Sequence, residues 1–207
     1  MLFQRRREVA VWQRHIDAFF KHLGANAIGT HGTASGNFES IRVKGLWSKN
    51  EDTRFTYYRM SRRDILKILK KSGRIGLLRQ FVTIIDANLG AFEDSKLPHI
   101  WDKGVNRRFP LTHYGLVVGK TDVRFQDDLL TRPSLSKPGL WGFHKDNLLL
   151  TLRLSPKDVA ELAARYGTDH FISNDPTPEA VRLRRAVAFR LARKMLMHFR
   201  AIATQSA

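Results

Sequence analysis

The first segment of the chain has the hydrophobic period of an amphipathic helix. Apolar residues recur every three or four positions over residues 5–23, and Gly24 stands where a glycine often ends a helix. The pattern therefore predicts a helix over this range, with one apolar stripe. That stripe consists of Val9, Trp12, Ile16, Phe19, Phe20 and Leu23.

The residues after this helix lose that period. Residues 24–37 (GANAIGTHGTASGN) contain four glycines and few apolar side chains, which predicts a flexible loop. Apolar and polar residues then alternate in 38–47 and again in 54–60, with a polar stretch over 48–53 between them. This arrangement predicts two strands of a β-hairpin.

A second helix is predicted to follow the hairpin. Ser61 is a candidate N-cap, Asp64 stands three residues later, and the apolar period continues until Gly73. The run QFVTIID at 80–86 is rich in β-branched residues, which predicts a buried strand. Residues 87–112 combine proline, glycine, aspartate and aromatic residues, and we expect mostly loop there.

The chain after residue 113 has clearer signals for the starts of helices. Ser155-Pro156 and Thr177-Pro178 each place a capping residue before a proline, so helices are predicted to 166 and to about 202. Residues 132–142 contain two prolines and two glycines, typical of a long connection. Short strands are predicted at 114–118, 123–125 and 148–154.

These elements mix helices and strands without a regular βαβ rhythm, which favours an α+β fold. We expect a small mixed or antiparallel sheet flanked by amphipathic helices, with a long basic helix at the C-terminal end. The 207 residues are predicted to form a single domain, 1–207, with a flexible glycine-rich loop at 24–37.

The charge balance of the chain indicates a class of binding partner. Thirty-six lysines and arginines stand against nineteen aspartates and glutamates, a formal net charge of +17. Charge of one sign repels itself in a compact chain, and a polyanion offsets it. Nucleic acid is the commonest such partner, because neutralising phosphates also releases condensed counterions.

The predicted C-terminal helix carries the densest charge. It has seven bases and one acid, Glu179, so pairing within the helix leaves most of the bases without a partner. This favours a nucleic-acid surface. Two alternatives stay open, namely a solvated face or protein partner, and a helix lying on anionic lipid. The seven bases are Arg182, Arg184, Arg185, Arg190, Arg193, Lys194 and Arg200.

The predicted hairpin combines aromatic and basic residues. Phe55, Tyr57 and Tyr58 are interleaved with arginines, and aromatic side chains beside guanidinium groups can stack unpaired bases. Tyr58 is the aromatic residue expected to face outward. The pattern favours RNA or single-stranded nucleic acid over duplex DNA. The predicted binding residues are Arg42, Lys44, Arg54, Tyr58, Arg62, Arg63, Lys67, Lys70, Lys71, Arg182, Arg190, Arg193, Lys194 and Arg200.

No signature in the sequence predicts a metal site or a cofactor. The chain has no cysteine, which excludes disulfides, zinc fingers and iron–sulfur clusters. It also has no apolar run of about 18 residues that could span a bilayer. We expect a soluble cytoplasmic protein, without a membrane partner, that acts as an accessory subunit of a nucleoprotein complex together with other protein subunits.

The alternative hypothesis is a nuclease. Asp94-Ser95-Lys96 matches half of a metal-dependent nuclease site, and Asp86 stands upstream as a second carboxylate. A second form of the nuclease hypothesis rests on Gly142-Phe143-His144-Lys145. This sequence resembles the G-x-H-R phosphate-binding turn of ParB/sulfiredoxin-like proteins, with lysine in place of arginine. The resemblance implies that His144 lies beside a phosphate. That family has a helix after the turn, whereas a strand is expected here over 148–154.

Overall fold

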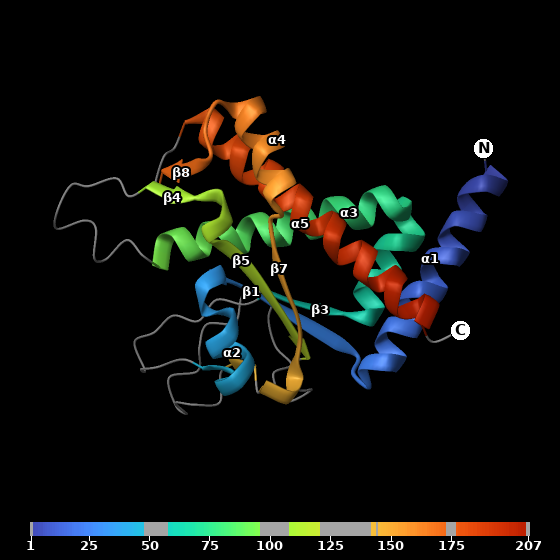
Figure 1. Cartoon of the computed structure of the whole chain (residues 1–207). Coiled ribbons are helices and arrows are strands. Elements are labelled where there is room, and N and C mark those ends of the chain that lie inside the picture. The colour runs from blue at the N-terminus through green and yellow to red at the C-terminus, as the bar shows by residue number, and fades with distance from the viewer. Residues whose placement is uncertain are drawn as a thin grey trace.

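The computed structural model describes residues 2–47, 58–95, 108–120, 142–143, 145–172 and 177–205 (Figure 1). Its helices are α1 (Leu2–Leu23), α2 (Phe38–Lys44), α3 (Arg62–Ser95), α4 (Pro156–Tyr166) and α5 (Pro178–Gln205). Its strands are β1 (Ala27–Ala34), β2 (Leu46–Trp47), β3 (Tyr58–Ser61), β4 (Arg108–Pro110), β5 (Tyr114–Lys120), β6 (Gly142–Phe143), β7 (Leu148–Arg153) and β8 (His170–Ile172). The α+β fold is confirmed.

Four strands form an antiparallel sheet in the order β3-β1-β5-β7. Strand β1 lies inside this sheet, paired with β3 on one side and β5 on the other. Two smaller pairs, β2 with β6 and β4 with β8, are also antiparallel. Of the two options left open by the sequence, the sheet is therefore antiparallel.

Three helices, α1, α3 and α5, pack against one another beside the sheet (Figure 1). Their shared core contains the ring of Phe199, whose centroid lies 4.1 Å from that of Phe19 and 5.7 Å from that of Phe81. A buried hydrogen bond, 2.8 Å from the Asn88 amide to the Thr30 hydroxyl, ties α3 to β1. The long helix α5 thus uses its apolar face inside the protein.

Helix α2 packs on a second small core around Val117. The ring of Phe38 in α2 lies so close to Gly115 that a Cβ atom there would stand 2.3 Å from a ring carbon. Gly115 therefore permits a helix to approach a strand backbone closely, which is a recognised role for glycine inside a strand.

The predicted flexible loop at 24–37 is wrong. Gly24, with φ of 60°, ends α1 as expected, but Ala27–Ala34 is a strand inside the sheet and is largely buried. The glycines of this segment do not disrupt the strand, because neighbouring strands on both sides satisfy its backbone groups.

The predicted hairpin is also wrong. Residues 38–44 form helix α2, in which Phe38 and Ile41 are three positions apart and both buried. Only Leu46–Trp47 is extended, and it pairs with β6. Strand β3 pairs with β1 instead of with residues 38–47.

Helix α3 contains both a confirmed boundary and a wrong strand. Gly73 has a non-helical backbone, with φ of 65° and ψ of −167°, so the first helical segment ends where the sequence predicts. The chain then resumes a helix to Ser95, which includes 80–86 and the first part of the predicted loop at 87–112. The run QFVTIID is therefore helical, with Phe81, Ile84 and Ile85 in the core.

The helices and strands predicted after residue 113 are confirmed where the structure describes them. Strands β5 and β7 lie at the predicted positions. Ser155 caps α4 through a capping box with Asp158, and Gly167 ends that helix. Residues 123–125 and 132–141 lie outside the described ranges, and Gly142, the last residue of the predicted connection, is in strand β6. No helix in the described part of the chain is long and apolar enough to cross a membrane.

Candidate nucleic-acid interface

The first half of α3 presents four cations to solvent. Arg63, Lys67, Lys70 and Lys71 recur at the spacing of one helical face, and all are exposed. The intervening Ile65 is completely buried in the core, which fixes the orientation of the helix. At 1.5 Å rise per residue, the four positions extend over about 12 Å of surface. We call these four residues the α3 cationic surface.

Helix α1 runs beside this surface in the opposite direction. Its Arg5 guanidinium donates a 2.8 Å hydrogen bond to the Lys71 carbonyl, while Asp17, near the other end of α1, accepts one of 2.6 Å from Arg62. Arg5 therefore satisfies a carbonyl group in the last turn before the break at Gly73. It also adds a fifth cation at the edge of the α3 cationic surface. Two further arginines of α1, Arg6 and Arg7, are exposed.

The acidic residues near the α3 cationic surface are engaged with other groups. The Asp64 carboxylate accepts a hydrogen bond from the Ser61 hydroxyl, and Glu8 lies 3.5 Å from Arg74. Among the described residues, no acidic side chain forms an ion pair with Arg63, Lys67, Lys70 or Lys71. These cations thus keep their charge available to an external anion.

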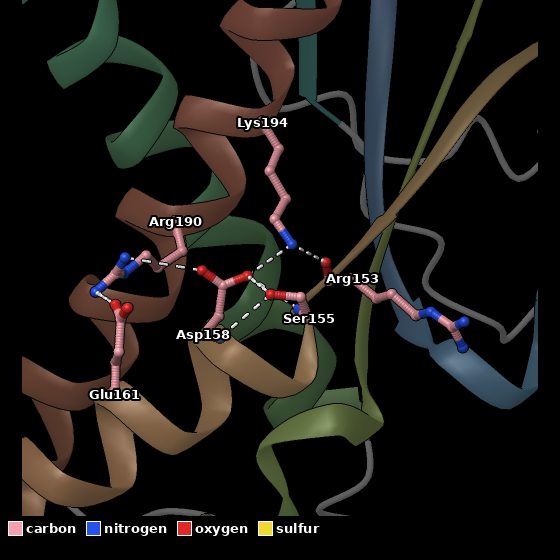
Figure 2. A network of polar contacts seen from close by, with 6 residues as sticks. All are labelled: Arg153, Ser155, Asp158, Glu161, Arg190 and Lys194. Atoms are coloured by element: carbon pink, nitrogen blue, oxygen red, sulfur yellow. Dashed lines mark hydrogen bonds and ion pairs between the residues drawn. The ribbon is translucent and has the colours of Figure 1, made fainter.

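The bases of α5 are in a different situation. Lys194 Nζ lies 2.7 Å from Asp158 Oδ2 and donates a 2.8 Å hydrogen bond to the Arg153 carbonyl (Figure 2). Arg190 lies 2.6 Å from Glu161 and 3.8 Å from Asp158. Figure 2 shows these groups converging between α4, α5 and the end of β7. We call Asp158, Glu161, Arg190 and Lys194 the α4–α5 ion-pair network.

Asp158 is the centre of this network. Its carboxylate also accepts hydrogen bonds from the backbone N–H of Ser155, at 2.9 Å, and from the Ser155 hydroxyl, at 2.6 Å. Burial of this side chain, which is 13% exposed, by itself raises the pKa. The hydrogen bonds from Lys194 and Ser155 outweigh burial and lower the pKa of Asp158 to about 2. The group is a permanently charged anchor at neutral pH.

Other bases of α5 also have acidic partners. The guanidinium of Arg184 lies 2.9 Å from Asp86 of α3, and that of Arg185 lies 3.8 Å from the same carboxylate. Arg182 pairs with Glu179 one turn earlier. The sequence prediction, which counted only Glu179 as a partner, is therefore wrong for Arg190 and Lys194. Their acids come from α4, whose position relative to α5 the sequence does not reveal.

Arg193 and Arg200 are the exposed bases of α5 without an ion pair among the described residues. The bases of the predicted C-terminal helix thus point in different directions. Arg190 and Lys194 turn toward α4, whereas Arg193 and Arg200 face solvent. Their separation of seven residues, about 10 Å along the helix, leaves a sparser surface than that of α3.

The remaining predicted binding residues are only partly described by the structure. Arg42 pairs with Glu39 at 3.1 Å within α2, and Lys44 is exposed at the end of that helix. Arg54 and the side chain of Tyr58 lie outside the described part of the structure, although the backbone of Tyr58 pairs with Thr30. The hairpin pairing that favoured single-stranded nucleic acid is wrong, because β3 pairs with β1, and Phe55 and Tyr57 lie outside the described residues.

The nuclease residues behave differently from the prediction. Asp86 and Asp94 lie eight residues apart on one helix, about 12 Å, instead of following a strand. The Asp86 carboxylate is largely buried and held by Arg184. The Asp94 side chain and Lys96 lie outside the described residues.

The turn that resembles the ParB/sulfiredoxin-like motif is partly described. Gly142 and Phe143 form β6, Lys145 begins a 3₁₀ turn, and His144 lies outside the described residues. Strand β7 follows the turn, as expected, where that family has a helix. Comparison with known proteins adds no further relationship, since no protein-family model, curated protein or solved structure matches the chain.

Two features of the interface were missed at the sequence level. Arg5 was not among the predicted binding residues, although the run Arg5-Arg6-Arg7 was a visible signal. The acids of the α4–α5 ion-pair network had no comparable signal, because Asp158 and Glu161 are 29 or more positions away from their partners.

Proposed function

We propose that this protein binds nucleic acid through phosphate contacts made by the α3 cationic surface and the adjacent end of α1. The observation that carries the proposal is the group of four exposed cations on one helical face with no acidic partner among the described residues. The net charge of +17 on the whole chain supports it. The basic residues of α5 support nucleic-acid binding less strongly than the sequence predicts, because most of them are engaged in ion pairs.

The chemistry of these side chains suits phosphate recognition. Three of the four are lysines, whose flexible stems let an ammonium group follow a phosphate without a fixed geometry. Four such contacts would release about three or four counterions on binding, which gives affinity without sequence readout. The proposed role is accordingly a sequence-tolerant nucleic-acid-binding subunit.

A salt titration tests this proposal. Binding of labelled oligonucleotides is measured at several salt concentrations for the parent and for the double variant Lys67→Glu/Lys70→Glu. We expect affinity to fall by about tenfold or more at low salt, and the slope of log K against log[salt] to decrease by about 1.4 to 1.8. A parent protein that does not bind at 50 mM salt would disprove the proposal.

The matched control is Lys157→Glu/Arg165→Glu. It changes the net charge by the same amount, and both side chains are exposed on another element, helix α4. If affinity for the oligonucleotide depends only on total charge, the two double variants will lose the same amount of affinity. Equal losses would therefore rule out the α3 cationic surface as the binding site. The titration is run with single-stranded and duplex oligonucleotides, which determines the form preferred.

A further inference from the structure

A second surface, on α5, combines cations with exposed apolar side chains. Arg185, Phe189, Arg193 and Met197 follow one another at intervals of four residues, so their side chains form a single ridge along the helix. Phe189 is 41% exposed and Met197 is 67% exposed. Arg200 continues the same face one turn later. We call the first four residues the α5 ridge.

The arginines of the α5 ridge are open to solvent. Arg193 is exposed and has no ion pair among the described residues. Arg185 is 69% exposed, and its contact with Asp86 is long, at 3.8 Å, because Arg184 occupies that carboxylate at 2.9 Å. The ridge therefore alternates an available cation, an apolar side chain, a second cation and a second apolar side chain.

This alternation distinguishes the α5 ridge from the α3 cationic surface. Exposed aromatic residues, methionine and arginine are the residue types enriched in protein interfaces. A phosphate backbone would use the arginines but would leave Met197 beside a charged strand. An acidic protein segment would pair with the arginines and cover both apolar side chains, so all four residues favour the same kind of ligand.

Two other occupants fit the α5 ridge less well. A second copy of this chain would bring the same arginines against one another in a symmetric contact, which is electrostatically unfavourable. A lipid surface needs a broad apolar face, but Leu191, Met195 and Phe199 are buried in the core and only two apolar residues of the ridge remain.

We propose that the α5 ridge is a docking site for an acidic amphipathic helical segment of a partner protein. The ridge spans thirteen residues from Arg185 to Met197, about 18 Å, so a partner helix of about 12 to 14 residues would match its length. Acidic residues in the partner would face Arg185 and Arg193, and apolar residues would contact Phe189 and Met197. This site is separate from the proposed nucleic-acid surface, and neither proposal depends on the other.

Selection from a peptide library tests the docking site. A phage-displayed library of helical peptides of about 14 residues is panned against the full chain, with counter-selection against the variant Phe189→Ala/Met197→Ala. We expect enriched sequences to carry aspartate or glutamate and large apolar residues at intervals of three or four positions. An enriched peptide, synthesised and labelled, should bind the parent at least about tenfold more tightly than the variant, since two hot-spot side chains are lost.

The control variant is Val43→Ala/Ile75→Ala, which shortens two other exposed apolar residues, 67% and 62% exposed. It should bind the selected peptide like the parent, and thermal melting checks that all variants fold. Failure to enrich any peptide, enrichment without acidic residues, or equal binding to the ridge variant and the parent would overturn the proposal. The proposal would also be overturned if the variant Phe189→Ala/Met197→Ala kept its affinity for the peptide but lost binding to a single-stranded oligonucleotide or to phosphatidylserine vesicles.

Discussion

Helices α3 and α5 are both rich in lysine and arginine, yet their charges are used differently. In α3, Arg63, Lys67, Lys70 and Lys71 face solvent without acidic partners among the described residues. In α5, Arg190 and Lys194 bind acids of α4, and Arg184 binds Asp86. One helix therefore has charge available for a ligand, while much of the charge on the other holds the fold together.

The difference arises from what lies next to each helix. The cationic part of α3 lies beside α1, whose first turns are basic and whose two nearby acids, Glu8 and Asp17, pair with Arg74 and Arg62. The bases Arg190 and Lys194 of α5 lie beside α4, where Asp158 and Glu161 face α5 across a partly buried junction. A count of charges within one helix therefore does not predict which of them can bind a ligand.

The largest predicted effect comes from reversing charge inside the α4–α5 ion-pair network. Arg190→Glu/Lys194→Glu would place four carboxylates together and leave Asp158 without its main partners. Breaking fully buried ion pairs costs about 3 to 5 kcal/mol, and because these side chains are 13% to 41% exposed we expect about 3 kcal/mol. For a chain of this size that loss corresponds to a melting temperature lower by roughly 10 °C. Thermal melting followed by circular dichroism measures it.

The same charge change on α3 is the control. Lys67→Glu/Lys70→Glu alters two exposed lysines without ion pairs among the described residues, so its melting temperature should stay within about 2 °C of the parent. Similar melting temperatures for the two double variants would contradict the distinction between the helices, and Arg190 and Lys194 would then belong with the solvent-facing bases.

Acid should weaken the α4–α5 ion-pair network selectively. The pKa of Asp158 is lowered from 3.8 to about 2, so its charged form stabilises the fold. A lowered pKa means that this stabilisation is complete above about pH 4 and is lost as the pH falls through 2. The difference between the two pKa values corresponds to about 2 kcal/mol.

Urea unfolding of the parent and of Asp158→Asn, at pH 7 and at steps down to pH 2.5, measures this effect. Asn cannot titrate, so the variant should be less stable than the parent by about 2 kcal/mol at pH 7, and the gap should narrow below pH 4. A gap that stays constant with pH would show that the charge of Asp158 is not what stabilises the junction.

Local signals at the ends of helices were the most reliable part of the sequence. Gly24 and Gly73 have positive φ and end helical segments, and Ser155 caps α4 at the predicted position. These signals depend on residues within one turn of the boundary, so their physics is contained in the sequence. The first helix and the last two were predictable for this reason.

Strand β1 was not predictable in this way. Gly29 and Gly32 remove the alternation that marks a strand, and the segment is extended because β3 and β5 bind it on both sides. Residues 80–86 were wrongly predicted to form a strand, because their β-branched side chains concealed the hydrophobic period of a helix. That period is visible over a longer window that includes Leu77 and Leu89, both buried.

The candidate site was predictable only in part, because charge and pairing are different properties. Helical spacing predicts the basic face of residues 63–71. The prediction holds because no acidic residue in the described structure forms an ion pair with this face. The pairing of α5 could not, because it depends on how α4 returns from β7 to lie on α5. Tertiary placement thus decides which bases remain available.

Arg5 gives the smallest expected effect and the finest test of the α3 cationic surface. Its guanidinium is exposed and donates one hydrogen bond to the Lys71 carbonyl, so Arg5→Ala should cost only about 0.5 kcal/mol of stability. If Arg5 also contacts a phosphate, as we expect, the slope of log K against log[salt] should fall by about 0.7 to 0.9. Arg5→Lys keeps the charge and should restore that slope. A slope that is unchanged in Arg5→Ala would limit the nucleic-acid surface to α3 itself and assign Arg5 to the helix end alone.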